Sequence, residues 1–233
     1  MQDLSPLDYV SGFQANKLLL ERNRTVKKID WNGEVTSVQP RIRLNRSFDE
    51  INHGYLGYSL CIEGAVSGNP QAFWVGIGKA AQEKYEFHCG VTANGKAHPV
   101  QDSRIESVEY YKVSGLSVAG LAEAVQVDGP PWHGMPPNLE IYRSRGHRRL
   151  PARTYESGCS SCIWGCRMPV IITVDHWNPE QRQYRLEAFC YGPKSCRLYK
   201  SGPTRKVPGR KGMSWEEEDW VDEEATAHRE SDE

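Results

Sequence analysis

The chain has 233 residues, of which 38% are hydrophobic and 25% charged, and its formal net charge is −1. This length allows one large domain or two small ones with a buried core, and the 21 glycines and 14 prolines favour β structure and argue against a helical bundle. The longest apolar run, about the length of MPVIITV, is far shorter than the roughly 20 residues of a membrane-spanning helix. The N-terminal MQDLSPLDYV lacks the basic and apolar regions of a signal peptide, so we expect a cytoplasmic protein without membrane association.

The small net charge conceals a segregation of charge along the chain. Residues 141–215 contain 15 Lys or Arg against 4 Asp or Glu, a local net charge of +11. Residues 216–233 contain 10 acidic residues and one basic residue, a local net charge of −9. Such segregation predicts a polyanionic partner and a separate acidic tail.

The first half of the chain is expected to begin with a helix and continue as strands. Apolar residues at loosely helical spacing predict a short helix over residues 4–21. The pairs Asn32-Gly33 and Asn94-Gly95 predict tight turns, the first of them inside a β-hairpin over residues 25–44. Further strands are expected at residues 55–64, 71–78, 84–92, 96–100 and 107–116.

Five or more short strands with glycine breaks favour a small closed or nearly closed β-barrel. We therefore predict a mainly β (α+β) protein with an OB-like domain over residues 1–127, and a β-sandwich is the alternative. A proline- and glycine-rich stretch, VDGPPWHGMPPN, cannot continue a helix or a central strand. It predicts a linker over residues 128–138, followed by a cysteine-rich ribbon with a basic arm over residues 139–215 and an acidic tail over residues 216–233.

Five of the seven cysteines cluster in this second region. Cys159 and Cys162 form a CxxC motif, Cys166 follows four positions later, and Cys190 and Cys196 form CYGPKSC. The two groups flank a predicted β-hairpin, residues 168–174 with 183–189, which would return Cys190 to the neighbourhood of the CxxC turn. Two intervening residues let both sulfurs of a CxxC face one ion, so the spacing predicts a structural metal site.

The identity of the metal and the choice of four ligands among the five cysteines stay open. Four thiolates around zinc make a closed tetrahedral site without a position for substrate, and the same number of cysteines can hold a [4Fe–4S] cluster. Five unrelated buried cysteines, or a nucleophilic cysteine with His147 or His176 as its base, are the competing interpretations. Cys61 and Cys89 lie in expected strands and are predicted to be small buried side chains.

Basic residues flank the predicted ribbon on both sides, and arginine binds phosphate oxygens bidentately. The first domain could carry a nucleic-acid-binding face formed by Arg41, Arg43, Arg46, Trp74 and Lys79. Trp74 could equally belong to the hydrophobic core. The candidate nucleic-acid-binding residues of the ribbon are Arg143, Arg145, Arg148, Arg149, Arg197, Lys200, Arg205, Lys206, Arg210 and Lys211.

These features together favour a non-enzymatic nucleic-acid-binding protein with a zinc site, whose basic arm orders on binding and is modulated by the acidic tail. A protein-interaction or assembly module that uses the Trp-containing acidic tail is the second hypothesis. An enzyme with an iron–sulfur or zinc centre is the third.

Overall fold

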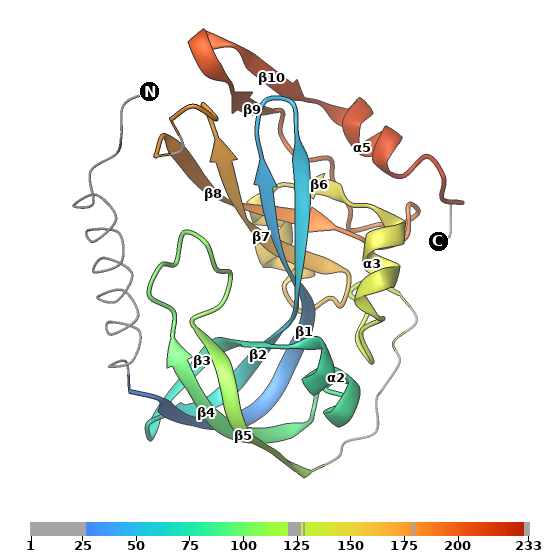
Figure 1. Ribbon diagram of the computed structural model, residues 1–233. Coiled ribbons are helices and arrows are strands. Elements are labelled where there is room, and N and C mark those ends of the chain that lie inside the picture. The colour runs from blue at the N-terminus through green and yellow to red at the C-terminus, as the bar shows by residue number, and fades with distance from the viewer. Residues whose placement is uncertain (1–26, 121–126, 128, 179, 231–233) are drawn as a thin grey trace, which may run out of the picture.

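The computed structural model describes residues 27–120, 127, 129–178 and 180–230 (Figure 1). The helix expected over residues 4–21 lies outside the described residues. The described part is mainly β, as predicted, and no helix within it is both long and apolar enough to cross a membrane. The strands are β1 (Ile29–Arg46), β2 (Ile51–Val66), β3 (Asn69–Ile77), β4 (Thr92–Pro99), β5 (Tyr110–Gly120), β6 (Arg148–Leu150), β7 (Gly165–Thr173), β8 (Arg182–Cys190), β9 (Arg205–Pro208) and β10 (Ser214–Glu217).

Short helical segments connect these strands. They are α2 (Lys79–Tyr85), α3 (Leu139–Arg145), α4 (Ala152–Thr154), α5 (Asp219–Ala225), the π-helical turn η1 (Tyr155–Cys159) and the 3₁₀ turn η2 (Arg210–Gly212). Figure 1 shows the long β1–β2 hairpin running from a lower group of strands, β1–β5 with α2, to an upper group that contains β6–β10 and α5.

Strand β1 organises the large mixed sheet because it pairs with three neighbours. It pairs along nearly its whole length with β2, through Ile29 to Glu34 with β4, and through Leu44 to Arg46 in parallel with β7. The hydrogen-bonded order is β2-β3-β5-β4-β1-β7-β8-β6, with the additional β1–β2 pairing. The link between β3 and β5 is a single parallel pair, Val75 with Tyr110.

The turn predicted at Asn32-Gly33 is wrong, because both residues lie inside β1. Gly33 pairs with Gly64 of β2 and with Ala93 of β4. A Cβ atom at Gly33 would lie 2.4 Å from the carbonyl oxygen of Glu63. The glycine is therefore required by the close approach of two strands and not by a turn.

Two further local predictions are corrected by the structure. Asn94-Gly95 also lies inside a strand, β4, where Gly95 packs against the indole of Trp31, 3.1 Å from where its Cβ would be. The strand expected at residues 84–92 is replaced by the end of helix α2 and a loop. Helix-forming residues, Lys79 to Lys84, follow Gly78 directly and explain this helix.

The hairpin predicted between the two cysteine groups is confirmed. Strands β7 and β8 pair antiparallel from Thr173 with Arg182 to Gly165 with Cys190. Short strand β6 extends the sheet on the other side of β8. This register places Cys190 opposite Gly165, the residue before Cys166, and close to the CxxC turn.

One hydrophobic cluster extends through both groups of strands. It includes Trp31 and Leu60 from the first group, Met168 and Phe189 from the second, and Tyr142 of α3. The predicted linker, residues 128–138, contributes to this packing where it is described, since Tyr58 donates a hydrogen bond to the carbonyl oxygen of Pro137 at 2.9 Å. The predicted domain boundaries stay a prediction, and the two parts share both a sheet and a core.

The basic arm, which we expected to become ordered on binding, already forms a β-hairpin in the structure. Strands β9 and β10 pair antiparallel, so that Lys206 lies opposite Glu216 and Arg205 opposite Glu217. Glu217 also forms a buried ion pair with Arg46 of β1. The first acidic residues of the tail are therefore paired with basic residues of the same chain.

Candidate functional site

Four of the five clustered cysteines lie together where the CxxC turn meets the end of β8. Cys159 ends the turn η1, Cys162 lies three residues later, Cys190 is the last residue of β8, and Cys196 lies in the loop that follows. Burial, and then the charges of Cys190, Cys162 and Cys196, raise the pKa of Cys159 to about 12. Each of the other three thiols is therefore an electrostatic neighbour of Cys159.

Cys166 lies apart from these four thiols. Its Sγ donates a hydrogen bond to the carbonyl oxygen of Pro40 at 3.3 Å, and its side chain belongs to the main hydrophobic cluster. Burial raises its pKa, with no contribution from another described cysteine. The structure thus separates the CxxCxxxC motif into a pair that faces Cys190 and Cys196 and a third cysteine in the core.

Backbone amides point at two of the four clustered sulfurs. The amide of Gly192 donates to Sγ of Cys190 at 3.3 Å, and hydrogen bonds from the backbone of Trp164 and Trp132 lower the pKa of Cys162. These donors favour the thiolate form, but burial outweighs them and raises the pKa of Cys162 to about 11. The raised pKa values of Cys159 and Cys162 favour their protonated forms, which disfavours a nucleophilic role, and a bound cation would have to displace these protons.

The amide of Gln39, on β1, holds the CxxC turn in place. Its Nε2 donates to the carbonyl oxygens of Cys159, Ser160 and Cys162 at 2.9–3.0 Å. Its Oε1 accepts a hydrogen bond from the hydroxyl of Tyr155 at 2.6 Å. The turn is therefore positioned by a buried polar side chain that lies 120 residues earlier in the chain.

Replacing Gln39 with leucine is expected to lower the free energy of unfolding by about 1–3 kcal/mol, because the carbonyl groups of the turn and the Tyr155 hydroxyl lose their buried partner. Denaturant unfolding of the purified variant measures this loss. The matched control is Gln71→Leu on β3, an exposed glutamine, which should change stability by less than about 0.5 kcal/mol. Equal effects of the two substitutions would contradict the anchoring role of Gln39.

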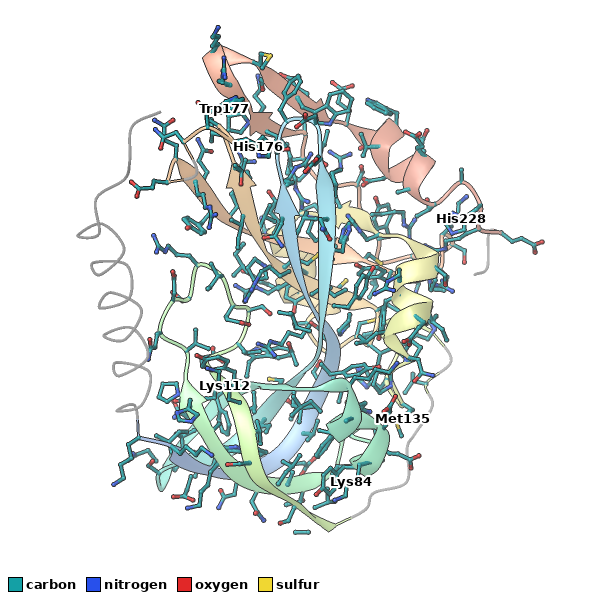
Figure 2. All side chains as sticks on the ribbon, viewed as in Figure 1. Lys84, Lys112, Met135, His176, Trp177 and His228 are labelled. Atoms are coloured by element: carbon teal, nitrogen blue, oxygen red, sulfur yellow. The ribbon has the colours of Figure 1, made fainter. Side chains whose placement is uncertain are left out.

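Within the described residues, no group of three or more His, Cys, Asp or Glu side chains is placed so that it could hold a metal ion. Metal binding by the four cysteines therefore stays a proposal. His147 and His176 do not act as bases in this cluster: His147 packs on Phe189 and His53, with ring centroids 4.5 and 4.9 Å away. His176 lies in the β7–β8 turn, 3.9 Å from Asp49 (Figure 2).

Three of the candidate phosphate-binding arginines are buried and engaged within the protein. Arg148 stacks on Tyr199 at 3.8 Å and donates to the carbonyl oxygen of Pro193 at 2.8 Å. Arg149 bonds both Asp222, at 3.0 Å, and Asp219, at 2.9 Å. Arg205 pairs with Glu187 at 2.9 Å and donates to the carbonyl oxygen of Ala188 at 3.0 Å.

The remaining basic candidates differ in how they are partnered. Arg143 lies over the ring of Tyr55, Arg145 donates to the carbonyl oxygen of Tyr191 at 2.8 Å, and Lys206 pairs with Glu216 at 2.7 Å. A last group is exposed and, within the part of the chain that the structure describes, forms no ion pair. Its members are Arg197, Lys200, Arg210 and Lys211.

The basic residues of the first group of strands are also paired. Arg41 and Arg43 both bind Glu106, at 2.9 and 2.7 Å, and Lys79 binds Glu140 at 2.5 Å. Trp74 on β3 is half-buried and lies outside the core cluster. Trp74 is therefore partly accessible to solvent. Arg41 and Arg46, in contrast, form ion pairs with Glu106 and Glu217.

The chain was also compared with known proteins, and no family model, curated protein or solved structure matches it significantly.

Proposed function

We propose that this chain is a non-enzymatic nucleic-acid-binding protein in which an OB-like unit is joined to a metal-stabilised ribbon. Support for the OB-like unit comes from the order of strand pairing. The pairs β1–β2, β2–β3, β3–β5, β5–β4 and β4–β1 return to the starting strand, and α2 lies between β3 and β4. An OB-fold is a five-stranded, partly open barrel that binds oligonucleotides on the face of strands 2 and 3 and with adjoining loops.

The proposed metal site consists of Cys159, Cys162, Cys190 and Cys196. Zinc is the proposed ion because four thiolates satisfy its tetrahedral preference in closed, structural sites. A [4Fe–4S] cluster, which takes the same number of cysteines, is the alternative. The mutual electrostatic influence of the four thiols and the separate environment of Cys166 support this choice of ligands.

The observation that carries the nucleic-acid proposal is a set of exposed cations on the ribbon that form no ion pair with any residue the structure describes: Arg197, Lys200, Arg210 and Lys211. Their neighbours Arg148, Arg149 and Arg205 stabilise the fold, which leaves this set available for phosphate. Each phosphate that is neutralised releases counterions, so binding by this set should depend steeply on salt.

Replacing Arg197, Lys200, Arg210 and Lys211 together with glutamine is expected to weaken binding of a labelled oligonucleotide at about 50 mM salt and to flatten its salt dependence by about 0.7–0.9 per lost phosphate contact. Anisotropy titrations between about 50 and 200 mM salt measure both quantities. The control is Lys84→Gln with Lys112→Gln, two exposed lysines that Figure 2 places on the lower group of elements. If the four changes alter neither the affinity nor the slope, the proposed interface is incorrect.

One observation supports a second candidate, a protein-interaction module. Trp215 and Trp220 are 37% and 45% exposed, and their rings pack edge to face with centroids 5.6 Å apart among acidic residues. Aromatic side chains of this kind are enriched in protein interfaces. Wild-type protein that binds neither single-stranded nor duplex oligonucleotide at low salt would favour this alternative. The first proposal also includes the acidic tail, whose carboxylates would compete with nucleic-acid phosphates for the exposed Lys and Arg side chains.

A further inference from the structure

A groove runs between the first group of strands and the β7–β8 hairpin, with a volume of about 330 Å³. Trp74 on β3 and the β4–β5 loop, residues 100–109, form one side of it. Arg167 on β7 and Leu186 on β8 form the other side. The groove is therefore composite, because neither group of strands would form it alone.

The polar groups of the groove leave one cation available. Arg167 is exposed and, within the described residues, forms no ion pair; its guanidinium lies 5.9 Å from the ring of Tyr155. Glu106 is neutralised by Arg41 and Arg43, at 2.9 and 2.7 Å. Glu109, which lines the groove as well, accepts a hydrogen bond from the backbone amide of Trp74 at 2.6 Å. The charged residues that line the groove are therefore Glu106, Glu109 and Arg167, and Arg41 and Arg43 offset the charge of Glu106. Within the described residues neither Arg167 nor the exposed Glu109 forms an ion pair, so Arg167 is the one cation of the lining and lies in the same groove as one carboxylate.

The aromatic and apolar groups lie beside that cation. Trp74 also lines the narrower continuation of the groove towards Gln39 and Tyr155, together with Arg167. Leu186 is 45% exposed at its edge. Trp74, which is partly exposed, and the guanidinium of Arg167, which forms no ion pair within the described residues, line the same groove. Together they offer a stacking surface for one base and a bidentate partner for the neighbouring phosphate.

We infer that this groove binds an unpaired nucleotide of a single-stranded nucleic acid, with the base on Trp74 and the adjacent phosphate on Arg167. This inference rests on the proposed function and assigns its substrate class. A single strand is required because a base can reach an aromatic platform inside a groove only when it is unstacked from a duplex. The groove volume is near the lower end for small-molecule sites, which is suited to one nucleotide.

The test uses the full-length protein and a labelled oligodeoxythymidylate of about 15 nucleotides, compared with a hairpin duplex that carries the same label. Trp74→Leu is expected to weaken single-strand binding by about 5- to 150-fold without changing its salt slope, because base stacking is lost and no charge is removed. Trp74→Phe keeps an aromatic ring and should stay within about 3-fold of wild type. Arg167→Gln should weaken binding and lower the salt slope by about 0.7, whereas Arg167→Lys should retain the slope.

The control is Trp177→Leu, which removes an indole that is 84% exposed in the β7–β8 turn, outside the groove (Figure 2). Its binding should equal that of wild type, and unfolding curves of all variants identify any loss of fold. If the wild-type protein binds no oligonucleotide at low salt, the proposed function fails and this inference fails with it. If wild type binds but Trp74→Leu and Arg167→Gln bind equally well, or if Trp177→Leu alone weakens binding, only the groove assignment is overturned.

Discussion

Replacing Cys159 or Cys190 with serine is expected to remove one equivalent of bound metal and to unfold the ribbon. The proposed ion would be held by four thiolates, and the free energy of binding such an ion is also free energy of folding, about 10–16 kcal/mol for structural zinc in small peptides. Burial raises the pKa of Cys159 to about 12, which disfavours its thiolate form when another ligand, such as Cys190, is missing. Elemental analysis of protein purified anaerobically measures the metal directly.

The matched control for this experiment is Cys166→Ser. It makes the same chemical change in the same motif, but at the thiol that donates to the carbonyl oxygen of Pro40. The variant should keep its full metal content, with a moderate loss of stability from the altered core. Protein that contains neither zinc nor iron in stoichiometric amount, or a Cys166→Ser variant that loses metal as Cys159→Ser does, would show that the four-cysteine assignment is incorrect.

The β7–β8 hairpin could be predicted because β7 is an apolar run, a polar turn follows it, and β8 begins directly after that turn. All of these signals are local in the sequence. The same kind of reasoning failed at Gly33, because the close approach of β1 and β2 at Gly33 and Gly64 is a tertiary contact. An Asn-Gly pair carries the same local signal in both situations. No residue near Gly33 in the sequence indicates that β2 packs closely against it.

The candidate site shows a similar division. The spacing of the cysteines predicted that Cys190 would return towards the CxxC turn, but it could not distinguish Cys166, whose Sγ faces β1. Gln39 could not be found from sequence either, since its hydrogen-bond partners lie 116 residues or more away. Long-range partners also explain why Arg148, Arg149 and Arg205, which the sequence predicted to bind nucleic acid, are buried: their burial depends on carboxylates and carbonyl groups that fold against them.

The sequence predicted an acidic tail that only modulates binding, but in the structure the tail also contacts the folded ribbon. Asp222 accepts hydrogen bonds from both the backbone amide and Nε of Arg149, each at 3.0 Å. At the end of the described tail, Arg229 donates to the carbonyl oxygen of Gly192, next to the cysteine cluster.

Truncation after Trp215 would therefore remove structural contacts as well as negative charge. Competition for exposed cations is better tested by changing Glu223 and Glu224, which are exposed and, within the described residues, form no ion pair.

Replacing Arg149 with methionine is expected to lower the free energy of unfolding by about 3–5 kcal/mol, because the change leaves Asp222 buried without its cation. Such a loss is a large part of the total stability of a domain, about 5–15 kcal/mol. Urea unfolding at neutral pH measures it, and the control is Arg153→Met, an exposed arginine for which we expect a change below about 0.5 kcal/mol.

The pH dependence of the Arg149→Met variant separates a lost ion pair from lost packing. Burial raises the pKa of Asp222, and Arg149 lowers it, so without Arg149 the folded-state pKa of Asp222 rises further above its value in the unfolded chain. A raised folded-state pKa makes the protonated, neutral carboxyl the favoured form in the fold, and the stability deficit relative to wild type should shrink as the pH falls from 7 towards 5. Adding Asp222→Asn to Arg149→Met should likewise cost less than the two single changes together. A deficit that is constant with pH, together with additive effects, would mean that Arg149 acts through the packing of its aliphatic stem and not through its charge.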